Sequence, residues 1–221
     1  MTISLQGSAD ANATLVAIPS HAVNDTLLFL VYRDNSTVSP TIPSDCVVLY
    51  QQAIGAAGYL IAAYKVAKTT SETSGTWTNA SHVLVLVFRP DANSLAIPEY
   101  LSTQTTTSAT VTFAAQATGT LRTNAEDLAV VGFVAQRNSA NNLAQAPGAM
   151  TNIRSGGNGS TYQVAANWEA SRTTAWASAN ITVATSALYR TAVIGISQVT
   201  FTSSGGSSAA RMVNINGGAD Q

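Results

Sequence analysis

Short apolar runs separated by Ser, Thr, Asn, Gly and Pro recur along the whole chain. The most apolar run, residues 83–88, lies between a Thr/Ser/Asn-rich lead-in and the Arg89-Pro90 pair. It is too short to cross a bilayer, which needs about 20 apolar residues. Its β-branched and aromatic side chains favour a strand buried on both faces. We therefore expect the fold to form around this strand.

The same pattern predicts further strands in both halves of the chain. They are residues 2–6, 14–18, 25–33, 46–50, 59–66, 127–134, 162–166 and 192–196. Helical spacing is poor almost everywhere, and β-branched residues dominate the apolar positions. The runs recur at about the spacing expected of a sandwich or barrel. The fold class is therefore predicted to be all-β.

The two halves resemble each other. An Asp-led strand, a Tyr-x-x-Ala-Ala segment, a Trp and an apolar strand follow Asp25 and, in the same order, Asp127. Two similar four-strand halves are what an eight-stranded jelly roll requires. No convincing Pro/Gly/Ser linker separates the halves. We expect one jelly-roll-like antiparallel β-sandwich over residues 1–201.

The composition changes beyond Phe201. Residues 202–208 have the Ser/Gly composition of a flexible linker. A short alternating segment follows, with apolar side chains at Met212, Val213 and Ile215. We expect residues 202–221 to form a linker and a C-terminal assembly arm. Such an arm would add to the sheet edge of a neighbouring subunit.

Charge is scarce in this chain. Its net charge is −1 and 10% of its residues are charged, so it has no electrostatic footprint for nucleic acid. A basic amphipathic helix for a membrane surface is also missing. The neutral polar coat suits a subunit of an assembly, because it lacks the repulsion that keeps proteins apart. Cys46, the one cysteine, is expected to be a small buried hydrophobe.

Catalytic and metal sites find little support. Ser20, His21 and Asp25 do not make a convincing triad, because neighbours on a strand face opposite ways and no nucleophile elbow occurs. His82 is interpreted as a polar end cap of its strand. Two isolated histidines and one cysteine give no zinc ligand set. The adjacent acids at 126–127 cannot face one glycosidase cleft. We expect no enzyme, no cofactor and no metal.

The three tryptophans divide into two interpretations. Trp77 is expected in the core. Trp168, beside Glu169 and near Arg172, is a candidate glycan contact, because aromatic rings on a sandwich surface can stack on sugar rings.

Residues 64–72, Thr76-Trp77-Thr78 and the strand into Phe88-Arg89 carry a family resemblance. The chain resembles a jelly-roll family found in bacteriophage virion proteins and some bacterial surface proteins. Members typically have a proline turn leading to Gly-Trp-Thr, whereas Asp45-Cys46 stands at the Gly-Trp position here. The resemblance implies a structural or adhesive module without an enzymatic role.

These observations lead to one functional hypothesis and one alternative. The hypothesis is a bacteriophage virion structural protein, either a capsid decoration (cement) protein or a tail or fibre subunit. It would be located in the virion, dock on capsid or tail subunits and form a homo-oligomer, a trimer suiting both settings. The alternative is a glycan-binding receptor-recognition module of a phage appendage or bacterial surface.

Overall fold

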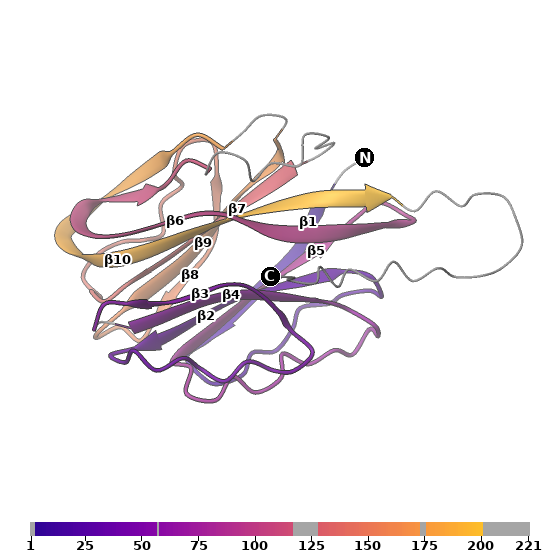
Figure 1. Ribbon diagram of the computed structural model, residues 1–221, viewed down its shortest axis with the longest axis horizontal. Coiled ribbons are helices and arrows are strands. Elements are labelled where there is room, and N and C mark those ends of the chain that lie inside the picture. Colours follow the sequence, from indigo (N-terminus) through magenta and orange to yellow (C-terminus); the bar gives the residue numbers. More distant parts are fainter. Residues whose placement is uncertain (1–2, 57, 117–127, 173–175, 201–221) are drawn as a thin grey trace, which may run out of the picture.

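The computed structural model describes residues 3–56, 58–116, 128–172 and 176–200. These residues form ten strands, arranged in two antiparallel five-stranded sheets (Figure 1). The strands are β1 (Ser4–Ala11), β2 (Thr26–Asp34), β3 (Val47–Ile54), β4 (Gly58–Val66), β5 (His82–Arg89), β6 (Ser94–Phe113), β7 (Leu128–Gln136), β8 (Thr151–Gly157), β9 (Gln163–Arg172) and β10 (Ala179–Thr200). No helix in these ranges could span a membrane. The all-β prediction is confirmed for this part of the chain.

Each half of the chain builds one sheet. The first sheet has the order β1-β5-β2-β4-β3 and the second has the order β6-β10-β7-β9-β8. Each half therefore forms five strands, whereas the sequence predicted four. Jelly rolls are built from eight strands in two Greek keys, and the observed strand order does not confirm that expectation.

The two sheets follow one plan, since adding five to each strand number of the first order gives the second. Even the irregularities correspond: β3 has a bulge between Val48 and Tyr50, and β8 has one between Asn152 and Arg154. The contacts between sheets also correspond, because β1 touches β8 and β3 touches β6. The sheets are thus related like the two copies of a symmetric dimer.

The recurrence seen in the sequence falls on the corresponding strands β4 and β9, but one residue out of register. Tyr162 faces the core between the sheets, whereas Tyr59 faces away from it. The residues that both face the core are Ala62 and Ala166. A slip of one residue moves a side chain to the opposite face of a sheet. The matched tyrosines therefore have different surroundings.

The core lies in three layers. The central layer joins the inner faces of both sheets, and each outer face carries a further apolar layer. Strand β5 contributes to two of them: Leu84, Leu86 and Phe88 face inward, while Val83, Val85 and Val87 face outward. All six are fully buried, which confirms the predicted two-sided strand. Burying such side chains contributes roughly 1.5–3 kcal/mol each.

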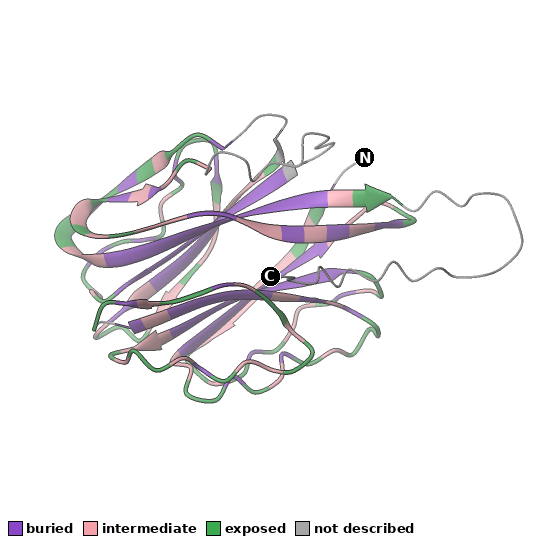
Figure 2. Ribbon diagram, viewed as in Figure 1, coloured by how far each residue is buried: buried purple, intermediate pink, exposed green. Residues whose placement is uncertain are grey.

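The strand predicted at residues 14–18 is wrong. This segment runs without regular structure and contributes buried Val16 to the apolar layer on the outer face of the first sheet. Its backbone pairs with a loop instead of a strand: Trp77 N–H donates to Thr14 O at 2.7 Å, and Val16 N–H donates to Ser74 Oγ at 3.1 Å. In the ribbon, buried residues lie mainly on the strands and exposed residues mainly on the loops and turns (Figure 2).

Strands β6 and β8 were missed from the sequence. Much of β6 is threonine, and it contains Pro98, which cannot donate to a ladder hydrogen bond. The proline is tolerated because β6 is an outer strand and pairs with β10 on one side only. Strand β8 is polar and ends in Gly156-Gly157, which the sequence pattern places in a turn.

Candidate functional site

The residues proposed from the sequence do not come together into one described site. Trp168 lies on β9, half-buried at the central core, with its ring centroid 5.8 Å from that of Phe88 on the facing sheet. Arg172 ends β9, but its side chain lies outside the described residues, as does the arm with Met212, Val213 and Ile215. Trp77 is 0% exposed, as predicted for a core residue.

Outer strand β3 is the best candidate for contact with another molecule. Val47 and Val48 are 51% and 39% exposed on it. Its sequence, VVLYQQAI, contains no proline and no charged residue. Natural proteins usually protect an exposed sheet edge with lysine, proline or a β-bulge. Strand β3 has a bulge between Val48 and Tyr50, but neither lysine nor proline. Because the far side of β3 is unpaired in the described structure, this edge can accept an added strand.

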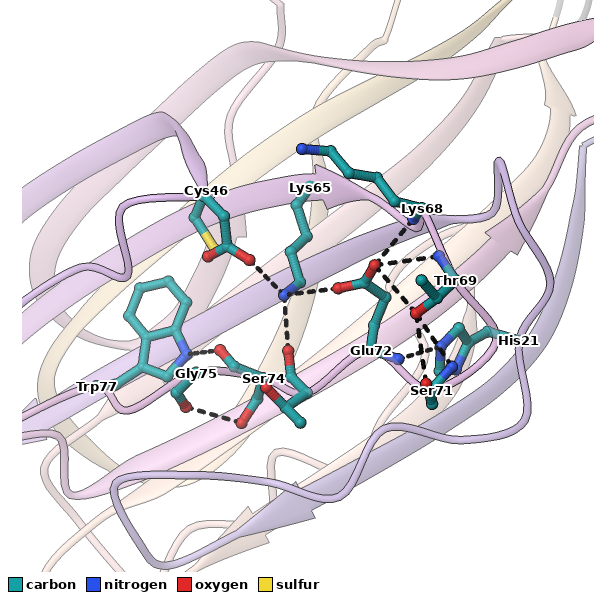
Figure 3. A network of polar contacts seen from close by, with 12 residues as sticks. His21, Cys46, Lys65, Lys68, Thr69, Ser71, Glu72, Ser74, Gly75 and Trp77 are labelled. Carbon is teal, nitrogen blue, oxygen red and sulfur yellow. Dashed lines mark hydrogen bonds and ion pairs between the residues drawn. The ribbon is translucent and has the colours of Figure 1, made fainter.

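A buried lysine fixes the chain where it enters β3 (Figure 3). Lys65 on β4 is 6% exposed. Its Nζ donates to Asp45 Oδ2 and to Thr73 O, each at 2.7 Å, and lies 3.4 Å from Glu72 Oε2. The hydrogen bond from Lys65 lowers the pKa of Asp45. Because Asp45 lies two residues before Val47, this network holds the start of the outer strand in place.

The cysteine beside this network is not a reactive thiol. Cys46 is half-buried against the outer apolar layer of the first sheet. Burial raises the pKa of its thiol to about 12, so it stays protonated near neutral pH. Nucleophilic attack and metal binding require the thiolate. The side chain therefore serves packing, although it is less buried than the sequence predicted.

His21 and Asp25, considered above as members of a catalytic triad, have separate structural roles. His21 Nε2 accepts a hydrogen bond from Glu72 N–H at 3.1 Å, and its Nδ1 bonds to Pro19 O at 2.8 Å. Asp25, which is 1% exposed, receives Arg89 Nε at 2.8 Å and Nη2 at 2.6 Å. This two-pronged pair joins the start of β2 to the end of β5. Both residues tie segments of the fold together.

A polar corner that sequence reasoning missed lies where β8 meets β1 and β5. His82 is 1% exposed, deeper than an end cap, and its Nδ1 lies 2.6 Å from Asn12 Oδ1. Its Nε2 lies 3.5 Å from Asp10 Oδ2 and has no hydrogen-bond partner in the described ranges. Asp10 also forms an ion pair with Arg154. Burial lowers the pKa of His82 to about 4, so the ring is neutral at pH 7.

Gly156 leaves room for this corner. A Cβ there would lie 2.6 Å from Asp10 Oδ2 and 2.6 Å from His82 Cε1. Such distances are too short for any side chain without a shift of these groups. A glycine inside a strand often marks a close approach of this kind. That is the one signal in the sequence that could have located the corner.

Among the described residues, no three His, Cys, Asp or Glu side chains are grouped to hold a metal ion.

Comparison of the chain with protein-family models, with curated proteins and with solved structures finds no match. What the protein does must therefore be inferred from its own residues.

Proposed function

We propose that the protein is a structural protein of a bacteriophage virion, acting as a capsid decoration protein or as a tail or fibre subunit. The observation that carries the proposal is the outer strand β3, which has neither a proline nor a charged residue and exposes the consecutive residues Val47 and Val48. A protein that meets no partner gains nothing from such an edge and risks aggregation. A subunit that docks by its edge uses it.

Rigidity supports the same assignment. Both faces of both sheets are covered by apolar layers, and the Asp25–Arg89 pair joins strand ends across the first sheet. A sandwich of this kind transmits load and presents fixed loops and edges. The resemblance of residues 64–89 to jelly-roll virion proteins supports the setting, with the virion as its location.

The docking itself is proposed to be strand addition between copies of this chain. The C-terminal arm, with its alternating Val213 and Ile215, has the pattern of a strand. Added to β3 of a neighbouring copy, it would satisfy backbone groups that the edge leaves free. Repeated around an axis, such an exchange gives a closed homo-oligomer, a trimer fitting both a capsid surface and a fibre.

Glycan binding has less support from the described residues. The ring of Trp168 packs against Phe88, so at least one part of the proposed sugar platform is engaged in the core. Titration with host surface polysaccharide, followed by tryptophan fluorescence, separates the two functions. A saturable change would favour the receptor-recognition module.

Quantitative mass spectrometry of purified particles tests the virion proposal. We expect the chain in the particle. A copy number of the same order as the major capsid protein identifies a decoration subunit, and a copy number like that of tail or vertex proteins identifies an appendage subunit. Absence from the particle overturns the proposal.

A further inference from the structure

The paired sheets provide an internal comparison, because each has a polar corner at the same place. Strand register sets the correspondence: Asp10 pairs with Leu84 on β5, and Thr103 pairs with Ala192 on β10. Leu84 and Ala192 are corresponding core residues, lying opposite β2 and β7 respectively. Asp10 therefore corresponds to Thr103. His82 lies two positions before Leu84, and Arg190 lies two positions before Ala192, so His82 and Arg190 also correspond.

The third position comes from the other sheet. Arg154 follows the bulge of β8 and lies opposite Ala166, while Tyr50 follows the bulge of β3 and lies opposite Ala62. Arg154 thus corresponds to Tyr50. The His82 corner consists of Asp10, His82 and Arg154, and the Arg190 corner consists of Thr103, Arg190 and Tyr50.

Charge is balanced in one corner and unbalanced in the other. In the His82 corner, the carboxylate of Asp10 pairs with the guanidinium of Arg154. In the Arg190 corner, the position of the acid is taken by Thr103. Within the described residues no carboxylate forms an ion pair with Arg190, which is 6% exposed. A buried charge is costly unless it is paired.

Arg190 is also short of hydrogen-bond partners. Its Nη1 donates to Tyr50 Oη and to Gln52 Oε1, but its buried Nε has no hydrogen-bond partner among the described residues. Lys65, also 6% exposed, has two carboxylates and a carbonyl around its Nζ. Within the part of the chain that the structure describes, Lys65 therefore has anionic partners and Arg190 has none.

We propose that the Arg190 corner binds an oxyanion, with the shape of a carboxylate, supplied from outside this chain. The Nε side of a guanidinium can offer two parallel N–H groups, which match the two oxygens of a carboxylate. Gln52, Tyr100 and Thr103 lie at this corner and are exposed or half-buried, so solvent reaches its edge. The Tyr100 ring stacks on Tyr50 with centroids 5.3 Å apart, which gives the site a flat wall. The site does not depend on the virion proposal.

Thermal unfolding of the full chain in different salts tests the site. We expect acetate or sulfate to raise the melting temperature saturably over sodium chloride of equal ionic strength, by about 3–6 °C at ten times the dissociation constant. A larger effect of acetate identifies a carboxylate, and a larger effect of sulfate identifies a tetrahedral oxyanion. Arg190→Met should abolish the difference between salts.

The internal comparison supplies the sharper variants. Thr103→Asp places an acid where the other corner has Asp10, so it should raise the melting temperature in chloride and remove the response to acetate. Asp10→Asn is the matched control, because it unbalances the His82 corner and should leave the response intact. An equal response to acetate and sulfate in wild type, Arg190→Met and Thr103→Asp would be a general salt effect and would overturn the proposal.

The Nε–H resonance of Arg190 provides a readout on the wild-type protein that needs no variant. It should move saturably with acetate or sulfate and stay in place with chloride. A resonance that does not move at saturating concentrations of both oxyanions contradicts the site.

Discussion

Trp77 and Trp176 cover opposite outer faces of the molecule in the same manner. Each indole lies in the outer apolar layer of its own sheet. The Nε1–H of Trp77 donates to Ser74 O at 3.1 Å, and that of Trp176 donates to Ala114 O at 2.8 Å. Each tryptophan precedes the second strand of its sheet: β5 lies between β1 and β2, and β10 lies between β6 and β7. The two residues thus attach loops to corresponding surfaces.

Replacing Trp77 by alanine should destabilise the fold strongly. The ring is fully buried and lies 5.5 Å from the Phe29 ring, so its removal leaves a large cavity. We expect the free energy of unfolding to fall by about 3–5 kcal/mol, measured by urea denaturation. Trp77→Phe, which keeps much of the volume, should cost clearly less. An unchanged midpoint for Trp77→Ala would show that the ring does not support the layer.

Stability should fall as the pH is lowered from about 6.5 to 4, because of His82. Burial lowers its pKa from 6.5 to about 4 in the folded protein. The charge of Asp10 raises this pKa in part, and the charge of Arg154 lowers it further. The unfolded chain therefore binds a proton in this range that the folded chain does not. The free energy of unfolding keeps the full contribution of the neutral ring above pH 6.5. It falls below that pH, and at pH 4 the loss is about 3 kcal/mol.

Urea denaturation at a series of pH values between 4 and 7 measures this loss. His82→Gln has no proton to gain there, so its curve should be flatter than that of the wild type by the same amount. Carboxylates that titrate in both proteins cancel in the difference. Parallel curves for the two proteins would contradict a buried neutral His82.

The two lysines of the chain form a matched pair for testing the network before β3. Lys65→Met removes the cation between Asp45 and Glu72 and leaves Glu72, whose side chain is 16% exposed, without it. We expect a loss of roughly 2–4 kcal/mol in the free energy of unfolding. Lys68→Met, at an exposed position, should change it by less than about 0.5 kcal/mol. Similar effects of both changes would mean that the network adds little.

Assembly should depend on the C-terminal arm and on the edge of β3. Deleting residues 203–221 should leave the melting temperature nearly unchanged and lower the average mass measured by light scattering at equal concentration. Val47→Lys, which gives β3 the protection that edge strands usually carry, should do the same. Val23→Lys is the control, because Val23 is 50% exposed and lies outside the strands. Assembly that persists in both edge and arm variants would refute strand exchange.

Long apolar runs predicted strands reliably. The run at residues 83–88 forms β5, and the runs after Asp25 and Tyr59 form β2 and β4. These strands are largely buried on both faces, so apolar residues occupy most of their positions. The outer strand β6 could not be recognised in this way, since a strand with one free edge tolerates threonine and proline. Segment 14–18 misled because it covers a sheet face and is apolar for that reason alone.

The polar corners show a second limit of sequence reasoning. His82 and Asp10 are more than seventy residues apart, and Arg154 comes from the other half of the chain. Short-range spacing cannot indicate that three such residues meet, because their meeting depends on the register of two sheets. The recurrence of the halves was visible, but its register was not, since a shift of one residue alters facing without altering composition.

The separation of the sheets by chain half has a consequence for the order of folding. All hydrogen-bonded strands of the first sheet lie within residues 4–89, so its ladders can close while the rest of the chain is still being synthesised. At 5–20 residues per second, the inner face of that sheet then waits roughly 5–20 s for its partner from the second half. During this interval Leu28, Leu30 and Leu86 have no cover. Newly made chains are therefore most exposed to mispairing, or to chaperone capture, halfway through synthesis.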